Sequence, residues 1–383
     1  MDLTERIDRR RSRSQENDLI VDRDALNPAV HPPEPVGRET LFEAMLDAID
    51  PLFDRAVPPN TYVWGPPGAG KSAIVTALIS ALESEMTGQR PFYTATRSGS
   101  DRADVRFVYL DARYANSRFR IYRELLDGLL VDTVPERGVS TDALEERITS
   151  VLGASETVLV AVDHLGEATT TEVSELGSFF EPFDNLAWLG IGRDPPEELS
   201  MPLPEQQVHV PAYTYELVDI LTVRGSRGLS QTLDHAHTQR IAEWADGDAH
   251  DALAALFVAA TEAEADGATR LRDAHIDAGI EAVPTDGVSM GQVLALSDNE
   301  TRVLEQVLDL SADGDERIDA VAARIADQTD LTEGTVKRLL YELAQFGVLE
   351  RRAVAVSGAT NGRRPSGVAP NFSARLFATL RDR

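Results

Sequence analysis

A glycine-rich segment near the start of the chain has residue types and spacing suited to binding phosphate groups. Gly65, Gly70, Lys71 and Ser72 occupy every required position of the pattern G-x-x-x-x-G-K-[ST]. Glycines let the main chain curl so that its N–H groups face phosphate oxygens, and a following helix adds the positive end of its dipole. A lysine here neutralises the β- and γ-phosphates, and the serine hydroxyl binds Mg²⁺. The loop therefore predicts a site for ATP or ADP with Mg²⁺, rather than a Gly-Pro turn that carries a lysine by chance. The predicted loop residues are Gly65, Pro66, Pro67, Gly68, Ala69, Gly70, Lys71, Ser72 and Ala73.

Such a loop needs a strand before it and a helix after it, and the flanking sequence predicts both. Residues 61–64 form a short apolar run, and residues 73–83 have helical periodicity. Further apolar runs at 107–110, 158–162 and 187–191 predict strands, and residues 40–53, 119–131 and 142–152 have the periodicity of helices. Strands that alternate with helices predict an α/β domain with a parallel sheet covered on both faces.

The second half of the chain changes from this alternation to helices and then to a smaller mixed pattern. Residues 215–283 are almost all helical, and residues 297–347 predict three short amphipathic helices. A strand at 348–356, a Gly- and Arg-rich loop and a short apolar return complete a winged helix-turn-helix pattern. We predict a flexible tail at 1–20, a nucleotide-binding domain at 21–200, a helical lid at 201–285, a linker at 286–296 and a winged-helix domain at 297–383.

The chain is strongly acidic, and its acidic residues are spread along its length. The 383 residues carry a net charge of −27, with 64 acidic side chains against 37 basic ones, of which only Lys71 and Lys337 are lysines. Concentrated salt screens the repulsion between such charges, so the composition indicates adaptation to a salt-rich cell interior; binding to basic partners is the alternative. The absence of cysteine excludes disulfides and thiol catalysis. Without a signal peptide or a long apolar segment, we expect a soluble, cytoplasmic protein.

The order of these parts resembles the archaeal origin-recognition and replication-initiator family of AAA+ ATPases, over about residues 18–380. Segments 26–39, 107–113, 134–138, 210–221 and 247–253 carry the resemblance, together with the phosphate loop. The resemblance implies an AAA+ fold with a helical lid and a C-terminal winged helix. It also implies that Val36 and Arg38 lie over the adenine, and that Tyr213 and Arg224 contact the nucleotide.

The chain departs from this family at positions that the family uses for hydrolysis. Asp163 ends a predicted strand, where it would bind Mg²⁺ with Ser72, but His164 stands where the family has a glutamate. A neutral imidazole is a poorer base for the attacking water; His164 positions that water or has no chemical role. Glu167 is a possible substitute. Arg193 stands where the family has a polar sensor; it binds the γ-phosphate or pairs with a nearby acid.

Two other groups of the family's hydrolytic apparatus are missing. His250 occupies the place of the family's nucleotide-sensing arginine, and the segment 199–210 holds no arginine that could act in trans. Binding groups are thus present while groups that act on the transition state are depleted. We therefore expect the chain to bind nucleotide and to hydrolyse it slowly. The candidate catalytic residues are Asp163, His164 and Arg193.

Basic residues gather at the C-terminal end of this acidic chain. Residues 330–383 hold nine basic side chains against five acidic ones. This distribution favours binding of duplex DNA by the winged helix, with origin-like DNA, other initiator subunits and a replicative helicase as partners implied by the family. The alternatives are a non-replicative DNA-binding regulator and an AAA+ relative that binds proteins. The candidate DNA-binding residues are Lys337, Arg338, Arg351, Arg352, Arg363 and Arg364.

Overall fold

The computed structural model describes residues 18–54, 56–87, 105–130, 138–153, 157–167, 170–200, 202–284, 287–288, 290–294, 296–311, 316–354 and 366–381. These residues belong to two compact units. One unit is His31–Glu216, and the other combines the N-terminal segment, as far as Val30, with Leu217–Arg383. Arg363 and Arg364 lie outside the described residues.

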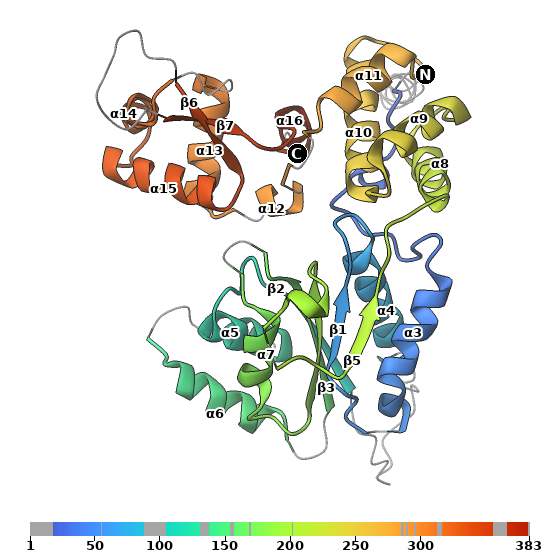
Figure 1. Ribbon diagram of the computed structural model, residues 1–383, viewed down its shortest axis with the longest axis vertical. Helices are drawn as coiled ribbons and strands as arrows, with labels where there is room; N and C mark the ends of the chain where they lie inside the picture. The colour runs from blue at the N-terminus through green and yellow to red at the C-terminus, as the bar shows by residue number, and fades with distance from the viewer. Residues whose placement is uncertain are drawn as a thin grey trace, which may run out of the picture. The chain divides into compact units, whose positions relative to one another are not determined.

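The unit His31–Glu216 is built around a five-stranded sheet in which all neighbouring strands are parallel. The strand order is β2-β3-β4-β1-β5 (Figure 1). In this order, β1 lies between β4 and β5, so the loop that leaves β1 emerges beside the carboxyl ends of both neighbours. The strands are β1 (Thr61–Trp64), β2 (Val105–Asp111), β3 (Thr157–Leu165), β4 (Leu186–Gly192) and β5 (Gln206–His209).

The sheet is covered on both faces because its central strands are apolar throughout. Along β3, Val158, Val160 and Val162 face one core, while Leu159 and Ala161 face the other. The first core packs against α5 (Arg118–Leu129), α6 (Thr141–Val151) and α7 (Val173–Phe180), and the second against α3 (Glu39–Ile49) and α4 (Lys71–Thr87) (Figure 1). Such continuous apolar runs are typical of parallel strands that are buried on both faces. The predicted α/β class is confirmed.

Several elements of this unit, among them α7, were not predicted from the sequence. The edge strand β5 pairs with β1 from Thr61 to Trp64, and only Val208 of its four residues is buried. A short 3-10 helix, η1 (Asp50–Asp54), follows α3, so the helix predicted at 40–53 ends earlier than expected. A second 3-10 helix, η2, spans Pro196–Glu198. Pro51 accounts for the end of α3, because a proline removes a main-chain donor.

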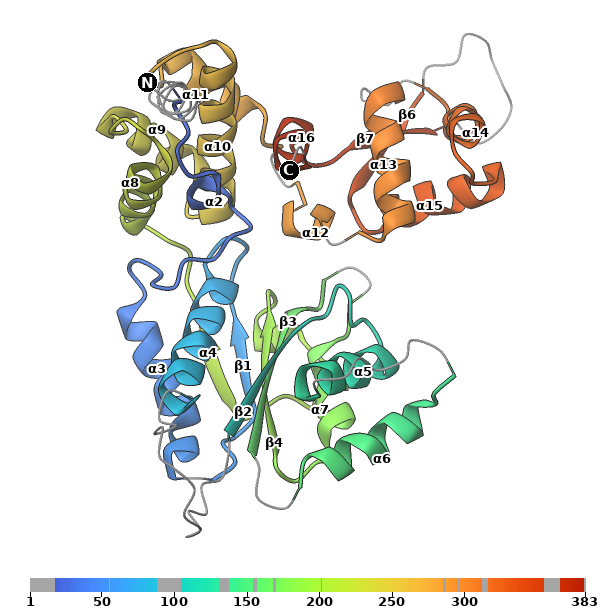
Figure 2. The same cartoon turned by 180° about the vertical axis from the view of Figure 1, so that it is seen from behind.

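The second unit contains a helical group. Its helices are α2 (Arg23–Leu26), α8 (Glu216–Gly228), α9 (His235–Ala245), α10 (Ala249–Ala265) and α11 (Asp273–Glu281). Helix α10 is alanine-rich and buried along most of its length, and α9 and α11 pack beside it (Figure 2). Small side chains permit this close packing: a side chain at Gly279 of α11 would overlap the main chain of α10 at Ala255.

The same unit also contains three helices followed by an antiparallel hairpin, an arrangement consistent with a winged helix. The hairpin pairs Leu349 with Pro370 and Ala353 with Ser366. The predicted apolar return is β7, followed by a helix, α16, that the sequence analysis did not anticipate. The elements are α12 (Met290–Leu294), α13 (Asp298–Ser311), α14 (Ile318–Gln328), α15 (Glu333–Gln345), β6 (Leu349–Ala353), β7 (Ser366–Pro370) and α16 (Ala374–Arg381). No helix in the described parts of the chain has both the length and the apolar character needed to cross a bilayer.

Candidate functional site

The glycine-rich loop connects β1 to α4 and turns through backbone angles that favour glycine. Gly68 has φ 62° and Gly70 has φ 84°, both in the left-handed region. Helix α4 begins at Lys71, so the N–H groups of its first turn lie at the loop. These groups and the helix dipole give the loop a positive potential suited to a phosphate.

Lys71 lies over the loop from which it extends. Its Nζ donates hydrogen bonds to the main-chain oxygens of Gly65 and Pro66, each at 2.7 Å. The ammonium group is therefore held at the mouth of the loop, where it can exchange these carbonyl partners for phosphate oxygens.

Arg38 and Tyr213 contact the loop and support its conformation. Arg38 is buried and donates to the main-chain oxygens of Ala69, at 2.7 Å, and Pro211, at 2.9 Å. Its guanidinium lies 3.6 Å from the centre of the Tyr213 ring, and the Tyr213 hydroxyl lies against Gly70. The structure thus brings Arg38 and Tyr213 to the loop, and partly buried Val36 lies two residues before Arg38. Arg38 contacts main chain here, which makes it a support of the loop.

Asp163 lies at the base of the loop, next to Ser72. The Ser72 hydroxyl hydrogen-bonds to the Asp163 carboxylate, and the Tyr109 hydroxyl donates to its Oδ2 at 2.5 Å. Burial alone would raise the pKa of Asp163, but the charge of His164 and these hydrogen bonds outweigh it and lower the pKa. Asp163 therefore stays ionised, as a Mg²⁺ ligand must.

His164 interrupts the β3 ladder directly after Asp163. Its φ is 62°, and the pairing of β3 with β4 shifts register between Val162 and Leu165. Its Nδ1 lies 3.1 Å from Oε1 of Glu167. Burial would lower the pKa of His164, but the neighbouring Asp163 and Glu167 raise it. The imidazole is thus held between two carboxylates in a backbone conformation that is uncommon for a residue other than glycine.

Glu167 and Arg193 form an ion pair beside His164. Their NH2 and Oε1 atoms are 2.7 Å apart. Burial would raise the pKa of Glu167, but the hydrogen bond and charge of His164, together with Arg193 and Arg113, lower it. Pairing with a nearby acid is one of the two roles expected for Arg193, and the structure shows such a pair. Sequence alone did not bring Tyr109 and Arg113 to the site; their positions at and just beyond the carboxyl end of β2 were the available signal.

The predicted nucleotide contact Arg224 belongs to the other unit, and so does His250, which stands in the place of the family's nucleotide-sensing arginine. Arg224 is buried and donates to the main-chain oxygens of Ala25, Val30 and Asn27, so its guanidinium fastens the N-terminal segment to α8. His250 accepts a hydrogen bond at Nε2 from the main-chain N–H of Met290, at 3.1 Å. Both side chains have structural partners within their own unit.

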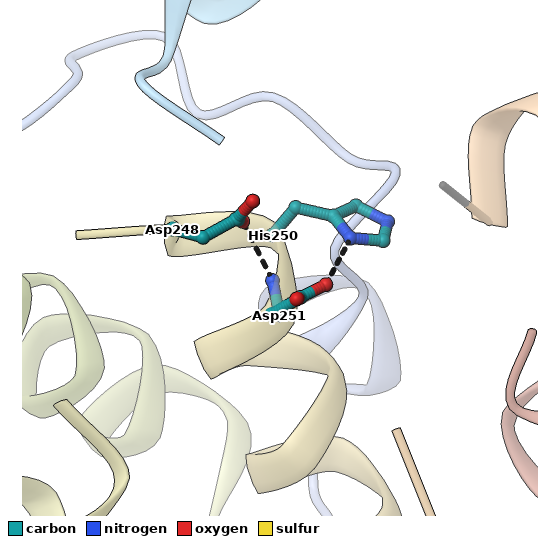
Figure 3. A group of neighbouring side chains, drawn as sticks. All are labelled: Asp248, His250 and Asp251. Carbon is teal, nitrogen blue, oxygen red and sulfur yellow. Dashed lines mark hydrogen bonds and ion pairs between the residues drawn. The ribbon is translucent and has the colours of Figure 1, made fainter. Parts of the chain in front are cut away.

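His250 also belongs to a cluster with two aspartates at the start of α10 (Figure 3). Ligand atoms of Asp248, His250 and Asp251 lie within 4.8 Å of one another. Asp248, however, accepts from the Asp251 main-chain N–H at 2.9 Å and caps the helix. Because the cluster lies at the positive end of α10, its geometry fits a helix cap better than a cation site.

The predicted DNA-binding side chains lie on α15 and β6 and have acidic or polar neighbours. Lys337 pairs with Asp319, and Arg338 with Glu342 at 2.6 Å. Arg351 donates to Ser366 and lies over Tyr341, while Arg352 pairs with Glu350. These four basic groups are thus at least partly exposed, and three of them are already paired with an acid.

The site around the loop fits a nucleotide with Mg²⁺. The loop offers main-chain donors and an ammonium group, while Ser72 and Asp163 offer two oxygen ligands in contact with each other. Beyond them, Glu167 and Arg193 add a carboxylate and a guanidinium at the same edge of the sheet. The arrangement can bind and polarise a terminal phosphate.

Comparison with known proteins agrees with this geometry. Residues 34–188 match the AAA ATPase domain family. An ORC1-type DNA replication protein of Methanocorpusculum labreanum is 24% identical over 379 residues, covering 88% of this chain and 85% of that protein. ORC1-type DNA replication protein 1 of Sulfolobus acidocaldarius is 24% identical over 377 residues, covering 88% and 87%.

Solved structures show the same fold. The Aeropyrum pernix ORC1 protein, in complex with DNA, superposes with a TM-score of 0.62 at 20% identity, covering 94% of this chain and 96% of that one. The Cdc6p protein of Pyrobaculum aerophilum gives a TM-score of 0.57 at 18% identity, covering 95% and 98%. The resemblance to archaeal origin-recognition AAA+ proteins and the predicted fold class are both confirmed.

Proposed function

We propose that this relative of the archaeal origin-recognition AAA+ proteins binds ATP or ADP with Mg²⁺ in its glycine-rich loop, hydrolyses ATP slowly, and binds duplex DNA through α15 and the β6–β7 hairpin. The observation that carries the proposal is the contact between Ser72 and Asp163 below that loop. Two oxygen ligands held together there, beside Lys71, form the essential part of a Mg²⁺–nucleotide site.

Each part of the site has a distinct role in this proposal. ATP supplies the transferable phosphoryl group, whose charge the bound Mg²⁺ neutralises. The loop N–H groups hold the phosphates, Lys71 binds their oxygens, and Ser72 and Asp163 hold the cation. Arg38 and Tyr213 keep the loop in shape.

Slow hydrolysis follows from the residues after Asp163. A general base must accept the proton of the attacking water, and His164 is held between two carboxylates that favour its protonated form. The loss of one well-placed group that stabilises a transition state costs about 3 kcal/mol, or roughly a hundredfold in rate. The nucleotide then acts mainly as a ligand whose identity sets the state of the protein.

The DNA role draws support from the relatives and from the basic surface on α15 and β6. One structural relative was solved in complex with DNA, as was the Drosophila ORC, with a TM-score of 0.53. Origin-like DNA, further initiator subunits and a replicative helicase are the partners we propose. The proposed domains are 21–200, 201–285 and 297–383, as predicted from the sequence.

One observation favours a second candidate, an AAA+ relative whose terminal domain binds protein. Asp319, Glu342 and Glu350 each pair with a basic side chain of the candidate DNA surface. DNA phosphates would have to replace these acids. An exposed face of mixed charge also suits a protein partner.

The two lysines of the chain provide a reciprocal test. Lys71→Ala and Lys337→Ala are compared with the unaltered chain in concentrated KCl for MgATP and MgADP affinity, by calorimetry, and for duplex DNA affinity, by fluorescence anisotropy at decreasing salt. We expect K71A to lose nucleotide affinity at least a hundredfold and K337A to leave it unchanged. K337A should weaken DNA binding about threefold or more.

The outcomes separate the candidates. Undetectable nucleotide binding by the unaltered chain at millimolar MgATP contradicts the nucleotide role. Turnover at an ordinary AAA+ rate that K71A abolishes contradicts slow hydrolysis. Undetectable DNA binding even at low salt, where phosphate contacts are strongest, favours the protein-binding candidate.

A further inference from the structure

Glu167 lies in the turn after β3 as a buried carboxylate with unequal contacts at its two oxygens. Its Oε1 contacts Arg193 at 2.7 Å and His164 at 3.1 Å. Its Oε2 is also buried, yet it has no hydrogen-bond partner in the described part of the chain. Only 6% of the Glu167 side chain is exposed, against 42% of the Arg193 side chain. The carboxylate is therefore fixed, while the guanidinium has room to move.

Strand register brings Arg193 beside the glycine-rich loop. Trp64 of β1 pairs with Gly192 of β4, and Gly65, the first loop residue, and Arg193 each directly follow this last pair of the two strands. Neighbouring strands are about 4.8 Å apart, a distance that an arginine side chain can span. Arg193 can therefore reach a terminal phosphate held by the loop without any change in the sheet.

If Arg193 moves away, positive charge still compensates Glu167. His164 remains on the same oxygen, and the charge of Arg113 acts on Glu167 as well. Arg113 in turn is anchored to Asp111 at 2.6 Å and cannot follow Arg193. The release of Arg193 thus costs one partly exposed ion pair, which is weak by comparison with a bidentate contact to a phosphate.

We propose that Glu167 is a positioning residue that competes with the terminal phosphate of ATP for Arg193. In the ADP state the guanidinium stays on Glu167, and in the ATP state it moves to the γ-phosphate. The affinity difference between ATP and ADP is then set by how firmly Glu167 holds Arg193. This inference rests on the proposed nucleotide site and adds to it the means by which the site distinguishes its two ligands.

The test is a double-mutant cycle on the full chain with Arg193→Gln, Glu167→Gln and both changes together. Calorimetry measures the affinities of MgADP and of a β,γ-imido analogue of MgATP. R193Q should reduce the preference for the triphosphate about tenfold, the value of one charge-assisted contact, and E167Q should raise it about threefold. The double variant should match R193Q, because Glu167 acts only through Arg193.

Controls separate this exchange from loss of structure. Arg118→Gln and Glu145→Gln break an ion pair on α5 and α6, at 2.8 Å, whose arginine is about as exposed as Arg193, and should leave the preference unchanged. ADP affinity reports whether the loop is intact in each variant. Glu167→Asp, which keeps the charge but shortens the reach, should fall between E167Q and the unaltered chain.

Three results would overturn the inference. They are an unchanged preference in R193Q, a lower preference in E167Q, and additive effects in the double variant. Failure of the proposed function looks different: the unaltered chain would bind neither nucleotide, which removes both claims together. If both nucleotides bind normally and R193Q does not change their affinities, only the exchange of Arg193 is contradicted.

Discussion

His164 sets the charge at the carboxyl end of β3. The neighbouring Asp163 and Glu167 raise its pKa above the ordinary value of 6.5, while the pKa values of both carboxylates are lowered. The raised pKa means that the folded protein binds the His164 proton more tightly than the unfolded chain does. This stabilisation is fully present below the unfolded pKa and disappears as pH rises through the folded pKa.

The variant His164→Asn tests this linkage. Asparagine tolerates the left-handed conformation at φ 62° but does not titrate. We expect the unaltered chain to lose stability relative to H164N as pH rises above about 6.5. Urea unfolding of both proteins at pH 6 to 9, with EDTA and without nucleotide, measures the difference. A constant difference across this range would contradict the proton linkage.

A second prediction at this scale concerns Gly70. An alanine here would adopt φ 84°, which costs about 1 to 2 kcal/mol, and its Cβ would overlap the Tyr213 hydroxyl. We expect Gly70→Ala to reduce nucleotide affinity about tenfold or more, measured by calorimetry. Gly153→Ala is the matched control, because Gly153 also has positive φ, of 46°, but open space around its Cβ position. Equal effects of the two variants on affinity would show that the loop tolerates this crowding.

At the scale of elements, Arg224 connects α8 to the N-terminal segment that contains α2. The buried guanidinium donates to four main-chain oxygens, at Asp24, Ala25, Asn27 and Val30. Burial lowers the pKa of Arg224, and nearby Arg227 lowers it further. The desolvation of this cation is offset by carbonyl acceptors, two of them at the C-terminal end of α2, where the helix dipole is negative.

Arg224→Gln should lower the free energy of unfolding by about 2 to 3 kcal/mol, because buried carbonyls lose their donors. Urea unfolding of the full chain measures this loss. Arg227→Gln, a change at an exposed position on the same helix, should alter it by less than about 0.5 kcal/mol. Similar losses in the two variants would indicate that helix α8 responds to any loss of charge, whatever the contacts of Arg224.

The elements that sequence predicted well are those with buried, continuous apolar patterns. Strands β1 to β4 and helices α5 and α6 lie within a few residues of their predicted positions, because the pattern of their apolar residues indicates which parts of the chain are buried. Strand β5 was missed since an edge strand needs only one buried residue, Val208. The loop and the Ser72–Asp163 pair followed from a motif. The Glu167–Arg193 pair did not, because it depends on the register between β3, β4 and β1.

At the scale of the whole molecule, we expect salt to act in opposite directions on folding, because the net charge is −27, and on the proposed binding to DNA. Like charges repel within a folded acidic chain, and added salt screens that repulsion. Phosphate contacts, by contrast, weaken as salt rises, with a logarithmic slope of about −0.9 for each contact. We therefore expect this chain to gain stability over the same salt range in which its proposed binding to DNA weakens.

We expect the midpoint of thermal unfolding to rise by about 10 °C between 0.1 and 2 M KCl. Salt removes several kcal/mol of charge repulsion, and each kcal/mol of added stability raises the midpoint by about 2 to 4 °C. Over the part of that range where binding is measurable, the DNA slope should lie between about −2 and −5, because only a few phosphate contacts are available to the basic side chains of α15 and the hairpin. Scanning calorimetry and anisotropy in the same buffers measure both quantities.

Sucrose at matched osmolality is the control for the unfolding midpoint, because it stabilises folded proteins without screening charge. A midpoint that responds equally to sucrose and KCl would show that charge repulsion is not what salt relieves. A DNA slope near zero would remove the phosphate contacts from the proposed function and leave the surface on α15 and β6 to a protein partner.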